Sequence, residues 1–186
     1  MAKKPTLAPQ SSEDFRHPTV TAKKGLDEVV SFTPLKVVEE LPTPWPRYQE
    51  IVTQFGASRK VPTKDDLVLA VSHAWSHQLH PDPLGKKAET VKKLTTEALK
   101  DHKISGEPLL FYDFMSMSQN PFEPGQPERS AKEQQDFLQA IAALPEVFFT
   151  ADAVLHVDGD WPDLEVERTR DYATWRTLFR VPTGVP

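Results

Sequence analysis

The chain has 186 residues, a formal net charge of −5 and no cysteine, a length that suits one domain with some additional chain. The negative charge argues against general nucleic-acid binding, which needs a basic face to neutralise phosphates. The lack of cysteine excludes disulfides, thiolate metal sites and cysteine nucleophiles. No apolar run approaches the roughly 18–20 residues that cross a bilayer, and the N-terminus lacks the apolar region of a secretory signal. We therefore expect a cytoplasmic protein that binds neither nucleic acid nor membrane.

The composition divides the chain into four parts. Residues 1–25 are rich in Pro, Ser, Thr, Ala and Lys and have little to bury, which is typical of a disordered tail. Residues 26–65 form a lead-in whose extended and helical pieces pack on the main domain. Residues 66–180 carry the main apolar pattern, and residues 181–186 form an irregular tail.

The lead-in shows a broken apolar pattern. Its residues Leu35, Val37 and Val38 predict extended chain, and the prolines around Trp45 favour an extended arm because proline opposes helix there. The helical spacing of apolar residues from Tyr48 to Phe55 predicts a short helix.

The main domain alternates short apolar runs with amphipathic segments. The expected elements are a strand at Leu67–Val71, a helix at Lys86–His102, a strand at Leu109–Phe114, a helix at Arg129–Leu144, a strand at Ala153–Val157 and a final short helix within 161–180. This alternation predicts an α/β fold with a parallel sheet and right-handed crossovers. Three strands leave the last one with a bare edge, unless the lead-in or a partner protein covers it.

Polar residues follow the first two strands, where open α/β sheets place their ligands. The first cluster contains Ser72, His73, Trp75, His77, His80 and Asp82. The second cluster contains Asp113, Ser116, Ser118 and Gln119. Because both clusters follow the carboxyl ends of parallel strands, we expect them on the same edge of the sheet and around one pocket.

Other chemistries are possible at this edge. Three histidines within eight residues could bind a divalent metal and support a metal-dependent hydrolase, although their spacing matches no standard zinc pattern. Ser72, His73 and Asp113 can be written as a catalytic triad, but nothing resembles the strained turn that exposes a serine nucleophile. The seven glycines form neither a Rossmann nor a P-loop spacing.

Two motifs carry a resemblance to a known group of proteins. The first runs from Val71 to Gly85, with SHAW followed by HPDPLG, and the second is FYDFMSMSQ at Phe111–Gln119. Arg129, Glu133 and Phe137 follow on a helix. Together these segments resemble a group of sequences similar to Toll/interleukin-receptor (TIR) domains, over about residues 66–180.

The resemblance implies a flavodoxin-like, three-layer fold with the first parallel strand at its centre. It also implies a signalling role with either NAD-type chemistry or self-association. On this basis we expect a nucleotide or NAD-type ligand rather than a bound cofactor or metal. The ligand-binding residues would be Ser72, His73, Trp75, His80, Asp82, Asp113, Ser116, Gln119 and Trp175.

The resemblance fails at one functional position. TIR domains that cleave NAD use a glutamate that follows a tryptophan on the helix after the third strand. Trp175 matches that tryptophan, but Phe179 stands where the glutamate is expected, and no carboxylate follows Trp175. We therefore expect NAD hydrolysis to be weak or lost, unless Glu165, Glu167 or Asp171 substitutes. The alternative function is a non-catalytic module that self-associates or docks a partner through the third-strand edge and the final helix.

Overall fold

The computed structural model describes residues 30–55, 61–76, 79–102 and 104–157. The expected final helix, with Trp175 and Phe179, lies outside the described residues, as do both tails and His77.

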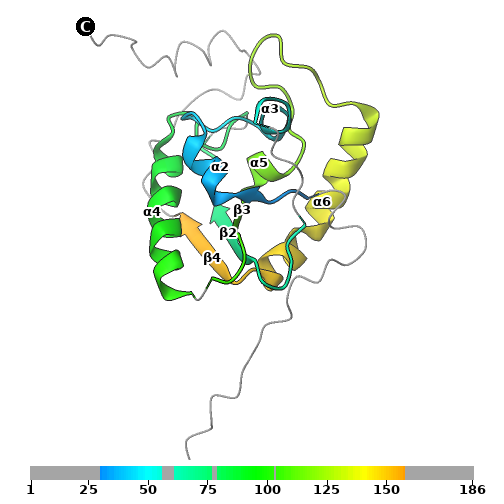
Figure 1. The fold of residues 1–186 in the computed structure, drawn as a ribbon. Helices are drawn as coiled ribbons and strands as arrows, with labels where there is room; N and C mark the ends of the chain where they lie inside the picture. The colour runs from blue at the N-terminus through cyan, green and yellow to red at the C-terminus, as the bar shows by residue number, and fades with distance from the viewer. Residues whose placement is uncertain (1–29, 56–60, 77–78, 103, 158–186) are drawn as a thin grey trace, which may run out of the picture.

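A four-stranded sheet forms the centre of the described chain, in the order β1-β3-β2-β4 (Figure 1). Its members are β1 (Thr33–Pro34), β2 (Leu67–His73), β3 (Pro108–Phe111) and β4 (Ala153–Val157). β2 pairs in parallel with both β3 and β4, so the predicted α/β fold is confirmed and the first parallel strand is central. β1 pairs with β3 in antiparallel orientation, which makes the sheet mixed rather than wholly parallel.

The apolar run of β2 is continuous because both of its faces are buried. Leu67, Leu69 and Val71 belong to one hydrophobic cluster, while Val68 and Ala70 belong to another on the opposite face. All five side chains are at most 6% exposed. This alternation places His73 on the same face as Leu69 and Val71, and Ser72 on the opposite face.

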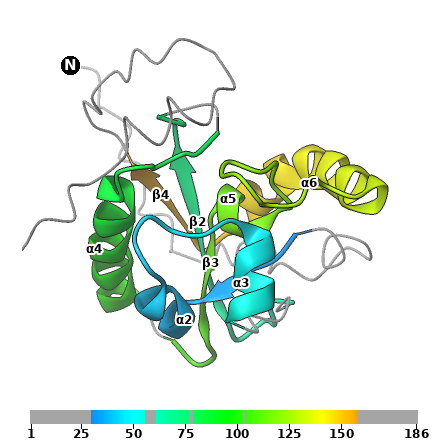
Figure 2. The same cartoon turned by 90° about the horizontal axis from the view of Figure 1, so that it is seen from above.

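The sheet lies between two layers of helices (Figure 2). Helices α2 (Leu35–Glu40), α3 (Tyr48–Gln54) and α4 (Lys86–Asp101) cover one face, where their apolar side chains pack with Leu69. Helix α6 (Ala131–Thr150) covers the other face through Ala140 and Val147. Ser130 and Glu133 form a capping box at the start of α6.

Three expectations about the helices and strands were wrong, one about the type of an element and two about where an element ends. Leu35, Val37 and Val38 form helix α2 rather than extended chain, because Leu35 and Val38 lie one turn apart and are both buried against the core. α6 continues through Pro145 to Thr150, with Val147 buried beyond the proline. β3 ends at Phe111, and the short helix α5 (Asp113–Ser116) begins in the segment expected to be strand and loop.

The two edges of the sheet differ. The lead-in strand β1 covers the outer edge of β3. Within the described part of the chain, β4 pairs with β2 alone, so the lead-in does not cover the third-strand edge. Among the described residues, no helix has both the length and the apolar character that crossing a membrane requires.

Candidate functional site

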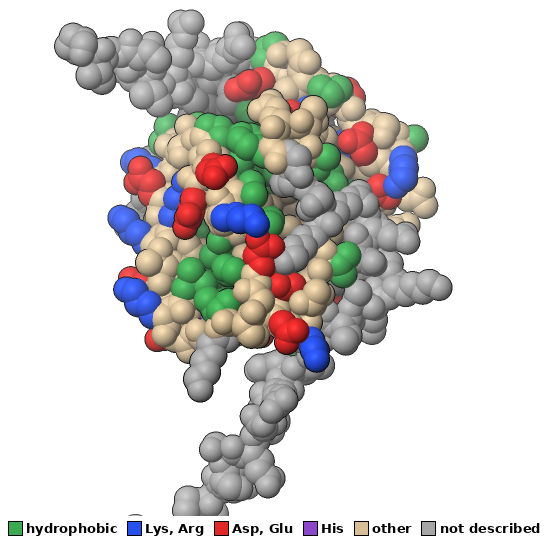
Figure 3. Space-filling model, viewed as in Figure 1, with side chains coloured by type: hydrophobic (Ala, Val, Ile, Leu, Met, Phe, Trp, Pro, Cys, Tyr) green, Lys and Arg blue, Asp and Glu red, His purple; other side chains and the backbone are tan. Residues whose placement is uncertain are grey.

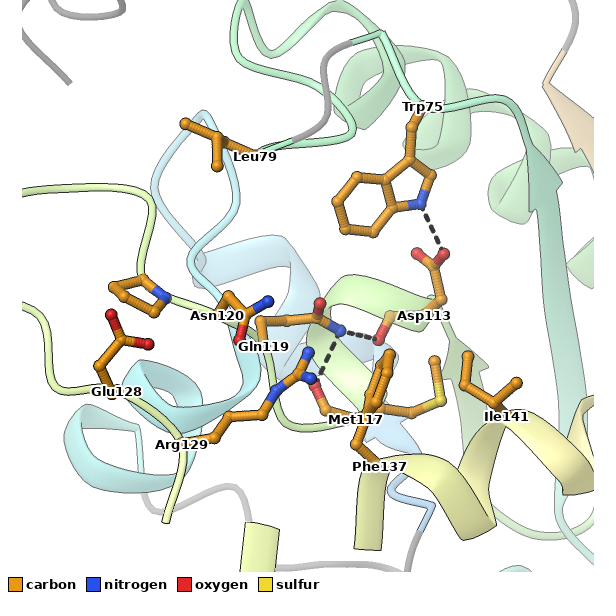
Figure 4. Close-up of a pocket in the computed structure, with 11 residues that line it drawn as sticks. Trp75, Leu79, Asp113, Met117, Gln119, Asn120, Glu128, Arg129, Phe137 and Ile141 are labelled. Atoms are coloured by element: carbon orange, nitrogen blue, oxygen red, sulfur yellow. Dashed lines mark hydrogen bonds between the residues drawn. The ribbon is translucent and has the colours of Figure 1, made fainter. Parts of the chain in front are cut away.

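A cavity of about 450 Å³ lies beyond the C-terminal ends of β2 and β3, between their loops and α6 (Figure 4). Polar and apolar side chains line it in similar measure. They are Trp75, Leu79, Asp113, Met117, Gln119, Asn120, Pro121, Glu128, Arg129, Phe137 and Ile141. The expected loops therefore meet at one pocket, and α6 adds a third wall to it.

Asp113 joins the two loops. Its Oδ2 accepts a hydrogen bond from the Trp75 indole (2.7 Å), which Figure 4 shows across the top of the cavity. Its Oδ1 contacts His73 Nε2 (3.1 Å) and accepts from the backbone N–H of Phe114 (2.6 Å). A carboxylate has roughly four acceptor positions, so three are occupied and about one remains for a ligand.

His73 supports Asp113 from below the cavity. Its side chain is 2% exposed and stacks on Tyr112, with ring centroids 4.4 Å apart and an interplanar angle of 7°. Burial, with the negative charges of Asp113 and Asp82, raises the pKa of the Tyr112 hydroxyl well above its ordinary value. Since Ser72 lies on the opposite face of β2, the His73–Asp113 pair does not extend to a serine.

The HPDP turn is structural. His80 is 1% exposed, and its Nδ1 accepts from the Asp82 backbone N–H (2.9 Å), which leaves Nε2–H to donate to the Trp45 carbonyl (3.1 Å). Asp82 accepts from the Ala88 N–H (2.8 Å) and so caps the start of α4. Gly85 has φ +72° and lies against Thr43, a position that only glycine fills without strain.

Lys87 is a buried residue that the sequence reasoning missed. Figure 3 shows basic and acidic side chains along the edge where α4 lies. Lys87 instead points inward, and its Nζ donates to the carbonyls of Ala74 and Pro81 (2.8 Å to Pro81). Burial lowers its pKa, while the nearby Asp82 and Asp113 oppose that shift. Lys87 thereby ties the loop that carries Trp75 to α4.

Gln119 is fixed by the lead-in. The side chain of Gln49 donates to the Gln119 carbonyl (2.8 Å) and accepts from its N–H (3.1 Å). The Gln119 amide group in turn donates to the carbonyls of Asp113 (3.1 Å) and Met117 (3.0 Å), as Figure 4 shows. Helix α3 therefore positions one wall of the cavity, although Gln49 and Gln119 are 70 residues apart in the sequence.

Arg129 provides the cation among the cavity-lining side chains. Its guanidinium carbon lies 3.7 Å from the centre of the Phe137 ring, and Figure 4 shows the group reaching toward Gln119. Burial lowers its pKa; Glu133 and Glu128 oppose that shift, and the positive charge of Arg47 adds to it. The sequence signal for this wall was the spacing of Arg129, Glu133 and Phe137 across the start of α6, which gave no reason to place these residues at the pocket.

The predicted site residues divide into three groups. Trp75, Asp113 and Gln119 line the cavity, and His73 supports Asp113. His80, Asp82 and Ser116 are buried in structural hydrogen bonds, with Ser116 Oγ accepting from the Tyr112 N–H (3.1 Å). Ser72 is not among the cavity-lining residues, and Trp175 is not described.

No group of three or more potential metal ligands occurs within the described residues. His80 has its one lone pair engaged by Asp82, so it could bind a metal only by breaking that bond.

The chain matches no protein-family model, no curated protein and no solved structure.

Proposed function

We propose that the chain is a TIR-like signalling domain that binds a nucleotide or NAD-type ligand in this cavity, with NAD hydrolysis weak or lost. The observation that carries the proposal is the composition of the cavity. An aromatic pair, a carboxylate and a guanidinium converge at the carboxyl ends of two parallel strands.

Each part of such a ligand has a matching group. The flat ring of Trp75 suits a base or nicotinamide ring, because aromatic side chains stack on heterocycles. The remaining acceptor position of Asp113 suits a ribose hydroxyl. The Arg129 guanidinium suits a phosphate, which it can bind through two parallel hydrogen bonds.

The expectation of weak hydrolysis rests on the residues that are present. The position where the resemblance expects a catalytic glutamate is Phe179, which cannot stabilise positive charge as nicotinamide leaves. Asp113 and Glu128 are the carboxylates that line the cavity, and Asp113 is already engaged by three donors.

Calorimetric titration with NAD and ADP-ribose tests the binding. We expect Trp75→Ala to abolish or greatly weaken binding, since it removes one aromatic wall and a hydrogen bond to Asp113. Phe149→Ala is the matched control, because Phe149 is 69% exposed and does not line the cavity. If the folded wild-type chain binds neither compound at millimolar concentration, the proposal is wrong.

Nicotinamide release from NAD tests the catalytic part. We expect little or no release at high protein concentration. Release that disappears in Asp113→Ala would show an active enzyme and would overturn the expectation of weak hydrolysis.

A second candidate is a non-catalytic interaction module. It is favoured by the β4 edge, which pairs on one side only within the described residues, and by the exposed side chains of Leu138 (59%) and Phe149 (69%) on α6. Sedimentation over a range of concentrations tests it. Self-association that Leu138→Lys prevents, with no nucleotide binding, would favour this function over the first.

A further inference from the structure

Two arginine nitrogens beside the cavity are buried without a hydrogen-bond partner: Arg47 Nη2 and Arg129 Nε. Burying a charged donor without an acceptor is costly, and such groups are rare in folded proteins. Of these two residues Arg129 lines the cavity, so an acceptor at this end of the cavity could partner its side chain.

The two side chains meet around the same short segment. Arg47 is 0% exposed, and its Nη1 donates to the carbonyl of Pro127 (3.2 Å), two residues before Arg129. The positive charge of Arg47 is among the causes that lower the pKa of Arg129. The fold therefore holds two like charges near each other, with Glu50 paired to Arg47 and with Glu133 and Glu128 acting on Arg129 in the opposite sense.

The neighbouring carboxylates do not supply the missing acceptor. Glu50 Oε1 binds Arg47 Nε (2.7 Å), and Glu50 Oε2 has no hydrogen-bond partner, so it reaches neither nitrogen. Glu133 Oε2 accepts from the N–H and hydroxyl of Ser130 in the capping box (both 2.8 Å). Glu128 lines the cavity and is exposed to solvent.

We infer that the Arg129 end of the cavity is an anion subsite that takes a phosphoryl group. Arg129, which lines the cavity, would contact the phosphoryl oxygens. Phe137 holds the Arg129 guanidinium flat, which limits the conformational freedom lost on binding. This inference rests on the proposed function and deepens it, because it fixes the orientation of the ligand: phosphoryl toward Arg129 and ring toward Trp75.

The test compares probes with and without a phosphoryl group. Titrations with AMP, ADP-ribose, adenosine and inorganic pyrophosphate are made on the wild-type chain and on Arg129→Gln. We expect Arg129→Gln to weaken binding of the phosphorylated probes at least about tenfold, because a charge-assisted hydrogen bond is lost. The affinity for adenosine should stay unchanged.

Two further variants sharpen the test. Lys132→Gln is the matched control, because it removes one positive charge from an exposed site three residues along the chain, in the first turn of α6, and it should leave all affinities unchanged. Glu128→Gln should act in the opposite direction and strengthen binding of the phosphorylated probes, since it removes negative charge from the cavity.

The outcomes separate this inference from the proposed function. Equal affinity for adenosine and AMP, unchanged in Arg129→Gln, would overturn the anion subsite but not the nucleotide pocket. Pyrophosphate binding that depends on Arg129, without nucleotide binding, would support the subsite and overturn the proposed function. No binding of any probe to the folded wild-type chain would overturn both.

Discussion

The two ends of the cavity use their polar residues differently. At the turn after β2, the buried groups of His80, Asp82 and Lys87 are hydrogen-bonded to backbone or to one another. At the α6 end, Arg129 keeps a buried nitrogen without a partner. The three turn residues have hydrogen-bond partners, although the Trp45 indole N–H and the Tyr112 hydroxyl near them do not, whereas at the second end the atom without a partner belongs to a charged side chain that lines the cavity.

This difference separates structural from functional polar residues. Dense polar motifs attract functional interpretation, yet most of the HPDP motif stabilises a turn and the start of α4. The unsatisfied arginine belongs to the spacing of Arg129, Glu133 and Phe137, for which the sequence predicted no binding role. Hydrogen-bond accounting therefore identifies the candidate binding group better than motif density does.

The largest effect is expected at the first end, from Lys87→Met. The change removes the charged donor to the carbonyls of Ala74 and Pro81, and the Pro81 carbonyl then keeps the N–H of Ser76 as its partner. We expect a loss of about 1.5–3 kcal/mol in the free energy of unfolding, measured with urea, since hydrogen bonds from a charged group are lost. The neighbouring Lys86→Met is the control, because Lys86 is exposed, and it should change stability by less than about 0.5 kcal/mol. Equal effects of the two variants would show that Lys87 does not hold the turn.

A smaller effect is expected at the cap of α6. Ser130→Ala should lower the free energy of unfolding, measured with urea, by about 1 kcal/mol, since it removes the hydroxyl that accepts from the Glu133 N–H. Hydrogen bonds from Ser130 are the main cause that lowers the pKa of Glu133 below its ordinary value of 4.5.

The pH dependence of the cap follows from this shift. Because the folded-state pKa of Glu133 is depressed, its contribution to stability is present above pH 4.5 and is lost as the pH falls through the folded-state value. The stability difference between wild type and Glu133→Gln, measured by urea unfolding at several pH values, should therefore shrink toward acid. A difference that stays constant with pH would show that the charge of Glu133 does not stabilise the cap.

The smallest effect on stability is expected from Arg129→Gln. The variant loses the packing on Phe137 and a hydrogen bond to Gln134, but it also removes a buried donor that has no partner. These contributions oppose each other, so we expect the free energy of unfolding, measured by thermal or urea unfolding, to change by no more than about 1 kcal/mol. A loss as large as that of Lys87→Met would remove the distinction between the two ends.

Sequence reasoning recovered the parts of the fold that depend on local pattern. The continuous apolar run of β2 predicted a central strand buried on both faces, and the one-sided apolar face of Lys86–Asp101 predicted α4. The chain order of strands and helices predicted the parallel pairing, which then placed Trp75 and Asp113 at one edge.

The parts that depend on tertiary packing were missed. The β-branched Val37 and Val38 favoured extended chain, but burial of Leu35 and Val38 outweighs that local preference in α2. Lys87 has the same residue type as its exposed neighbours on α4, so only its position relative to the turn reveals its role. The α6 wall is formed by residues distant in sequence from both motifs, and periodicity carries no information about such a contact.

The hydrogen bonds between Gln49 and the backbone of Gln119 make the lead-in part of the folding unit that carries the strand-end motifs. Trp45, 2% exposed, packs edge-on against Tyr112, and β1 closes one margin of the sheet. A shortened chain starting at Asp66 would keep both strand-end motifs but would uncover the aromatic side chains beneath them. The lead-in is thus an integral part of the cooperative structure, and an autonomous fragment must include the chain from Val30 onward.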